Sequence, residues 1–193
     1  TPMHGTAAIL MFTTRVIRGR SEAHVQLRHS LAGKHRDKMM NDTIEKRLSD
    51  LGVTIPAAAA PAANYVPFAQ SGNLLLTAGQ LPIADGKIQA VGLLGQDLDT
   101  EAGKNAAKLC AINILAQIQA ATGDLERIAR LVKITVFVAS APGFAEQHIV
   151  ANGASDFLAE VLGERGKHAR SAVGVAMLPM NAAVEIEAIV EVK

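Results

Sequence analysis

Residues 99–139, DTEAGKNAAKLCAINILAQIQAATGDLERIARLVKITVFVA, contain a long helical pattern followed by a strand pattern, and their order decides the fold. Residues 99–122 repeat apolar side chains at spacings of three and four, as an amphipathic helix does. This stripe consists of Ala107, Ala111, Ile114, Ile118 and Ala121. A glycine follows at position 123, so the helix should end there.

Apolar side chains then alternate along residues 131–139, which is typical of a strand with one buried face. Residues 144–162 repeat the helical pattern and end before Gly163. Apolar runs predict further strands at 74–80, 171–178 and 183–192, and Asp85-Gly86 is a common hairpin turn.

This order of elements predicts an α+β fold, a single domain whose mixed sheet has both helices packed on one face. The opposite face would carry apolar or small side chains that favour burial by another subunit. We assign four residues to that face: Leu75, Phe137, Ala172 and Ile189.

Positive charge is concentrated at the start of the chain. Residues 1–38 hold seven Lys/Arg and two acids, whereas residues 39–193 hold 12 Lys/Arg and 16 acids. We therefore separate a basic N-terminal extension, 1–38, from a folded domain, 39–193. The extension has three interpretations: a translated upstream or vector-derived segment, an Arg-rich organellar targeting peptide, or an ordered arm or basic tail.

Composition excludes several classes of protein. The chain has 193 residues, 3% aromatic residues, one cysteine (Cys110) and a net charge of +1. A single cysteine excludes an internal disulfide and a multi-thiolate metal site, and its place on the apolar helix stripe predicts a core residue. Few aromatics and little charge argue against nucleic-acid binding. No uncharged apolar run approaches the roughly 20 residues of a membrane helix. We expect a cytoplasmic protein without membrane contact.

Candidate catalytic side chains cluster near the C-terminus, where Arg170 enters one strand and Glu185 lies on the next. A guanidinium can bind a carboxylate through two parallel hydrogen bonds, and a carboxylate can hold a water as general base. Taken alone, each is more typical of a solvated surface charge. His168 and His148 are more typical of solvated positions.

The connection at residues 179–182 suggests a simple hairpin between the last two strands. Glu185 would then lie opposite about Ala176, and on the order of 20 Å from Arg170 in the same chain. The two charges could cooperate only if a second subunit brought its copy close, so any site should lie at a subunit boundary.

The segment from about residue 56 to 192 resembles the YjgF/RidA family, long labelled L-PSP endoribonuclease. The resemblance rests on three motifs: Gly79-Gln80-Leu81-Pro82, Ala169-Arg170-Ser171-Ala172-Val173 and Val184-Glu185-Ile186-Glu187-Ala188. The motif Val150-Ala151-Asn152-Gly153-Ala154-Ser155-Asp156 resembles the branch called YjgF/chorismate-mutase-like.

This resemblance implies a chorismate-mutase-like fold and a homotrimer whose clefts hydrolyse reactive 2-enamine/2-imine acids to 2-keto acids and ammonia. Arg170 would bind the substrate carboxylate, Glu185 would position water, and Gly79 and the backbone of Ala172 would line the cleft. The resemblance implies no metal and no cofactor, and a small 2-imino or 2-keto acid as ligand.

Four positions depart from the family pattern. Phe68, Ala78 and Ala172 stand where the family commonly has tyrosine, serine and cysteine, and His148 stands at an asparagine position. The cleft would be more apolar, so a non-catalytic trimer that binds small carboxylates is the alternative to a deaminase. An endoribonuclease is a third, less favoured hypothesis.

Overall fold

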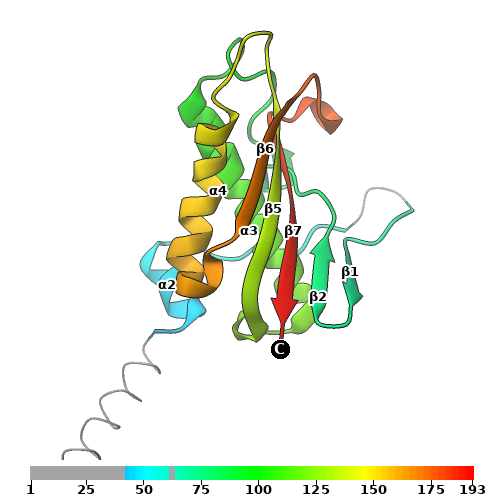
Figure 1. Ribbon diagram of the computed structural model, residues 1–193, viewed down its shortest axis with the longest axis vertical. Helices are drawn as coiled ribbons and strands as arrows, with labels where there is room; N and C mark the ends of the chain where they lie inside the picture. The colour runs from blue at the N-terminus through cyan, green and yellow to red at the C-terminus, as the bar shows by residue number, and fades with distance from the viewer. Residues whose placement is uncertain (1–41, 61–63) are drawn as a thin grey trace, which may run out of the picture. The chain divides into compact units, whose positions relative to one another are not determined.

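The structure is a computed structural model that describes residues 42–60 and 64–193, and residues 44–193 form one compact unit (Figure 1). The interpretations of residues 1–38 lie outside the described residues. The helices of this unit are α2 (Ile44–Asp50), α3 (Thr100–Thr122) and α4 (Gln147–Leu162). Its strands are β1 (Phe68–Ser71), β2 (Leu74–Thr77), β3 (Ile83–Ala84), β4 (Lys87–Ile88), β5 (Ile128–Ala139), β6 (Ala169–Val175) and β7 (Val184–Val192).

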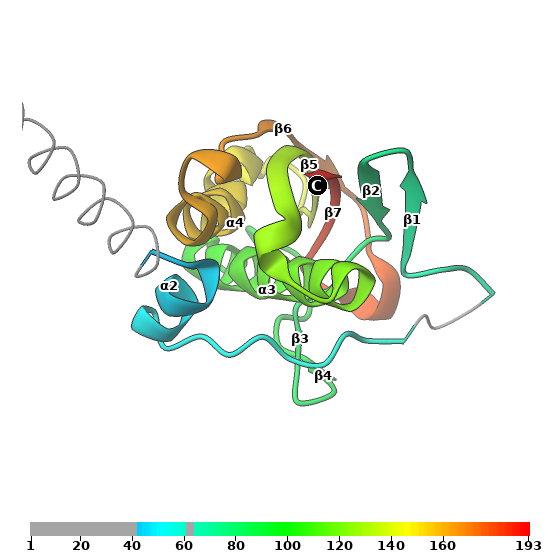
Figure 2. The ribbon, with the colours of Figure 1, turned by 90° about the horizontal axis from the view of Figure 1, so that it is seen from below.

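Five strands form one mixed sheet in the order β1-β2-β7-β5-β6. β5 and β6 run parallel, and the other neighbours are antiparallel. α3 and α4 pack against the same face of this sheet (Figure 2). The predicted α+β class, mixed sheet and helix placement are therefore confirmed. The Asp85-Gly86 turn is confirmed as well, because it joins β3 to β4 with both residues at positive φ.

The predicted hairpin between the last two strands is wrong, because β5 lies between β6 and β7. After β6 the chain pairs with residues 90–92 instead of turning back on itself. Ala183 N donates to Ala90 O, and Gly92 N donates to Asn181 O. These hydrogen bonds hold residues 181–183 beyond the end of β5. The strand β7 that follows therefore pairs with β5, and Glu185 pairs with Phe137 and not with a residue of β6.

The sheet face away from the helices differs from the prediction at two residues. Leu75 is buried on the helix side, and Ala172 pairs with Val136, which is also buried there. Phe137 and Ile189 do lie on the opposite face. That face is partly covered near Phe137 by a small cluster of Ala139, Leu178 and Ala182. Beyond the cluster Leu74, Leu76 and Val173 stay 37%, 40% and 43% exposed.

α3 and α4 approach each other closely at Gly153. A Cβ placed on this glycine would lie 2.0 Å from the backbone oxygen of Lys104 in α3. Cys110 lies on the sheet-facing side of α3, fully buried, with its Sγ 3.7 Å from Val184 O. Burial raises the pKa of this thiol well above its usual value. Cys110 is a core residue, as predicted.

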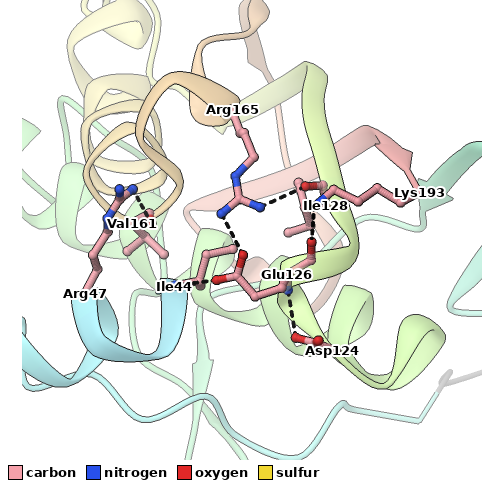
Figure 3. Close-up of polar contacts among 8 residues, drawn as sticks. All are labelled: Ile44, Arg47, Asp124, Glu126, Ile128, Val161, Arg165 and Lys193. Atoms are coloured by element: carbon pink, nitrogen blue, oxygen red, sulfur yellow. Dashed lines mark hydrogen bonds and ion pairs between the residues drawn. The ribbon is translucent and has the colours of Figure 1, made fainter. Parts of the chain in front are cut away.

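Hydrogen bonds to Glu126, which lies shortly after α3, hold α2 against the rest of the unit (Figure 3). Ile44 N, at the start of α2, donates to Glu126 Oε1 at 2.7 Å. Arg165 Nη2 donates to Glu126 Oε2 at 3.0 Å, and Lys193 Nζ donates to Glu126 O at 2.8 Å. The Glu126 carboxylate thus accepts from one of the backbone N–H groups that the first turn of a helix leaves without an intrahelical partner.

We predict that Gly153→Ala lowers the free energy of unfolding by about 1–3 kcal/mol, because a backbone oxygen cannot move aside as a side chain can. Helix propensity alone predicts the opposite sign, a stabilisation of about 1 kcal/mol. Urea unfolding of the full chain measures the difference. A neutral or stabilising effect would contradict this close contact.

Candidate functional site

The carboxyl group of Glu185 lies directly over Gly79. A Cβ on Gly79 would meet Glu185 Oε1 at 1.9 Å and Cδ at 2.7 Å, so that only glycine leaves room for the carboxyl group. Gly79 follows β2, and the adjacent Gln80 is held against β7 by reciprocal backbone bonds with Ile186 of 2.8 and 3.0 Å. The two motifs that contain Gly79 and Glu185 therefore meet in one protomer.

The environment of Glu185 disfavours its charged form. The side chain is half-buried, and desolvation raises its pKa, with a further contribution from Glu187 on the same face of β7. Among the described residues none donates a hydrogen bond to this carboxyl group. A water or a substrate could therefore occupy its acceptor positions.

The apolar candidates Ala78 and Phe68 lie near Gly79 in the fold but occupy different positions. Ala78 immediately precedes Gly79, and its N donates to Pro67 O at 2.9 Å. Phe68 begins β1 and pairs with Thr77, and it packs against the main core. Ala78 is thus the chain neighbour of Gly79, the residue that lies against the Glu185 carboxyl group, whereas Phe68 is directed toward the helix-covered side of the sheet.

Arg170 lies on β6, at the open edge of the sheet, and its side chain reaches across to α4. Its Nη1 donates to Asn152 Oδ1 at 2.9 Å and to Ser155 Oγ at 3.0 Å. Its Nη2 donates to His148 O at 3.2 Å. A guanidinium has five N–H donors, so two remain without a partner among the described residues. A carboxylate needs two donors for a bidentate contact.

Two more candidates accompany Arg170. The His148 side chain is exposed, and its contact with Arg170 comes from its backbone oxygen. Val175 O faces β5, because it accepts from Ser140 N. Since successive residues of a strand point their backbone groups to alternate sides, the backbone of Ala172 faces the open edge of β6.

These candidates form two separate groups within one protomer. Glu185 is level with Val173, three residues from Arg170 along β6, and two strand spacings lie between them. The Cα atoms are therefore about 14 Å apart. The side chains also leave opposite faces, since Arg170 pairs with the buried Ile134 and Glu185 pairs with Phe137. A small acid cannot contact both in one protomer.

Two of the residues that hold Arg170, Asn152 and Ser155, were not among the candidate site residues. Asn152 and Ser155 belong to a motif that served only to identify a family branch. Their spacing of three places them on one face of α4, but no sequence signal pairs that face with β6.

Two other kinds of feature are absent from the described part of the chain. No group of three or more His, Cys, Asp or Glu side chains there could hold a metal ion. Across residues 42–60 and 64–193, no helix has the length and apolar character needed to cross a bilayer.

Comparison with known proteins identifies relatives over most of the chain. A family model described as "YjgF/chorismate_mutase-like, putative endoribonuclease" matches residues 45–192. Protein TCP17 of Trypanosoma cruzi is 52% identical over 149 residues, which cover 77% of this chain and 93% of that protein.

Two solved structures are informative. Atu1372 of Agrobacterium tumefaciens, a protein of unknown function, is 57% identical with a TM-score of 0.75, and the match covers 81% of this chain and 96% of that one. TdcF of E. coli, solved with bound serine, is 27% identical with a TM-score of 0.53, and the match covers 70% and 94% of the two chains.

The raised pKa of Glu185 predicts a pH-dependent gain in stability from Glu185→Gln. A carboxyl group whose pKa is raised on folding destabilises the protein once pH exceeds its pKa in the unfolded chain, because ionisation is then harder in the folded state. We expect Glu185→Gln to raise Tm at pH 7.5, and the gain to disappear as pH falls below about 4.

Thermal melts of both proteins across this pH range measure the effect. Glu187→Gln is the matched control, and it should give a smaller gain of the same sign because it removes only the neighbouring charge. A lower Tm for Glu185→Gln at pH 7.5 would contradict the desolvation of this carboxyl group.

Proposed function

The chain belongs to the YjgF/chorismate-mutase-like family, and we propose that it is a hydrolytic deaminase of small 2-enamine/2-imine acids. It releases 2-keto acids and ammonia in clefts between the subunits of a homotrimer in the cytoplasm. The observation that supports this proposal is that Arg170 and Glu185, the two charged residues of the motifs, both have hydrogen-bonding positions left for a ligand. Arg170 keeps two N–H donors unused, and Glu185 has a desolvated carboxyl group that receives no hydrogen bond from the described residues.

Arg170 binds the carboxylate of the substrate. Its two remaining N–H groups match the two oxygens, and no described acidic residue forms an ion pair with it. The outward backbone of Ala172 lies two residues further along the same open edge and can add a donor. TdcF, a relative solved with bound serine, shows that a protein of this fold can hold a small amino acid.

Glu185 directs water onto the C=N carbon. As a carboxylate it accepts a proton from the water while the oxygen forms a bond to that carbon. It then returns that proton to the nitrogen, which gives a carbinolamine. The same carboxylate next takes the proton of the carbinolamine hydroxyl and passes it to the nitrogen, so that the C–N bond breaks, ammonia leaves and the C=O bond of the 2-keto acid forms. An imine is already electrophilic, so positioning and proton transfer suffice. A raised pKa suits a group that both takes and returns a proton.

The separation of Arg170 and Glu185 supports a site that is shared between subunits. Because they lie about 14 Å apart on opposite faces of the sheet, a complete site combines Arg170 of one protomer with Glu185 of the next. The sheet face that carries Glu185 also exposes Leu74, Leu76 and Val173, an apolar surface that a neighbouring subunit would cover.

We predict that the purified chain accelerates release of 2-ketobutyrate from the imine that threonine dehydratase produces. Arg170→Lys keeps the charge but loses the paired donors, so we expect KM to rise about tenfold or more. Glu185→Gln should lower kcat by about 10²-fold or more, because the general base is removed.

No acceleration over buffer by the folded wild-type protein would reject the deaminase. Binding of 2-ketobutyrate in a calorimeter without turnover would indicate the carboxylate-binding alternative, which the apolar side chains of Ala78 and Ala172 favour. Cleavage of RNA that survives Arg170→Ala would indicate an endoribonuclease.

Mixing two inactive variants tests whether the site is shared. Arg170→Ala and Glu185→Ala should each be inactive as pure proteins. After unfolding and refolding together in equal amounts, about one quarter of the boundary sites should combine both native residues and regain activity. Refolded wild-type protein is the control for recovery, and an inactive mixture would show that one protomer supplies both residues.

A further inference from the structure

Arg170 is held on α4 by neutral oxygen atoms. Asn152 and Ser155 each accept from its Nη1, and the backbone oxygen of His148, one turn earlier on α4, accepts from its Nη2. Three acceptors on one helix face thus fix the plane of the guanidinium. The fixed plane determines the direction in which the two unused N–H groups point.

Ser155 is itself held by His168. Ser155 Oγ and His168 Nε2 are 3.0 Å apart, and His168 Nδ1 is 2.6 Å from Gly166 O. A carbonyl oxygen only accepts, so Nδ1 carries the proton and Nε2 accepts from the Ser155 hydroxyl. The hydroxyl oxygen is then free to accept from Arg170. Arg170 therefore donates to Ser155, Ser155 donates to His168 Nε2, and His168 Nδ1 donates to Gly166 O.

The surroundings of His168 favour its neutral form in this chain of hydrogen bonds. Its burial lowers the pKa of its imidazole, and the nearby Arg170 lowers that pKa as well, although the bond to Gly166 opposes both effects. A neutral imidazole is the form that can accept from Ser155. A protonated imidazole would lose this bond and would repel the guanidinium.

In the part of the chain that the structure describes, no acidic group contacts Arg170. Asn152 Oδ1, Ser155 Oγ and a backbone oxygen bind the guanidinium without neutralising it. The nearest acid in the motif, Asp156, is exposed and has no contact with Arg170. An aspartate at position 152 would have nearly the same shape but would pair with the guanidinium and compete with any anionic ligand.

We propose that Asn152, Ser155 and His168 form a neutral cradle that orients Arg170 and reserves its charge for the carboxylate of the substrate. The inference rests on the proposed function and extends it, because it assigns specificity for anionic substrates to residues that do not touch the substrate. They are positioning residues that act through Arg170. The cradle also gives a physical role to the motif Asn152-Gly153-Ala154-Ser155, in which Gly153 packs on α3 while its two polar members hold Arg170.

Asn152→Asp in the full chain is the most specific test. We expect its Kd for 2-ketobutyrate, measured by calorimetry, and its KM for the imine to rise at least about tenfold, with kcat changed by less than about twofold. Asn152→Ala and Ser155→Ala should raise both constants less, about three- to tenfold, because they loosen Arg170 without neutralising it. Gln119→Glu, an exposed site on α3, makes the same change in net charge and should leave both constants unchanged.

A second readout does not depend on the ligand. The nitrogen chemical shifts of His168 should report a neutral ring with its proton on Nδ1 at pH 7.5. Ser155→Ala should remove the hydrogen bond at Nε2 and shift that signal. Thermal melts confirm that each variant is folded, and Ser155→Ala provides the binding test if Asn152→Asp does not fold.

The outcomes separate the two proposals. A wild-type protein that neither binds 2-ketobutyrate nor accelerates imine hydrolysis rejects the proposed function, and with it the substrate role of the cradle. A wild-type protein that binds, together with Asn152→Asp and Ser155→Ala variants that bind equally well, rejects the cradle alone. An unchanged His168 signal in Ser155→Ala contradicts the chain of hydrogen bonds itself.

Discussion

The position of β5 between β6 and β7 is the constraint on which the rest of this molecule depends. It separates the strand that carries Arg170 from the strand that carries Glu185 by two strand spacings, and the alternation of side chains places them on opposite faces. A single protomer therefore presents an incomplete site. The same arrangement places Arg170 at an open edge and Glu185 on the sheet face away from the helices, which is only partly covered, so that another subunit can reach each of them.

Within residues 42–60 and 64–193, neither Arg170 nor Glu185 has the ion-pair partner that a structural role would supply. Arg170 is held by neutral acceptors, and Glu185 lies desolvated over a glycine, beside the like charge of Glu187. Such arrangements disfavour the folded protomer, because a charge removed from water without a partner raises its free energy. Groups left in this state are typical of functional sites, where the missing partner is the ligand.

Local patterns of the sequence were reliable where the periodicity was strong and the side chains were apolar. The stripe that contains Ile114 and Ile118 predicted α3, and Asp85-Gly86 predicted the turn between β3 and β4. β1 was not predicted, because its four residues are mostly exposed and form an edge strand without an apolar alternation. Leu75 was assigned to the wrong face, since a one-residue shift reverses the direction of a side chain in a strand.

The sequence by itself determined the α+β class, the family and the two charged residues of the candidate site, because these depend on local periodicity and on short motifs. Only the tertiary structure decided which strands are neighbours. The hydrogen bonds of residues 181–183 with residues 90–92 carry β7 past β5, and no local pattern encodes a contact over that separation. For the same reason only the structure brought Asn152 and Ser155 of α4 to Arg170 of β6.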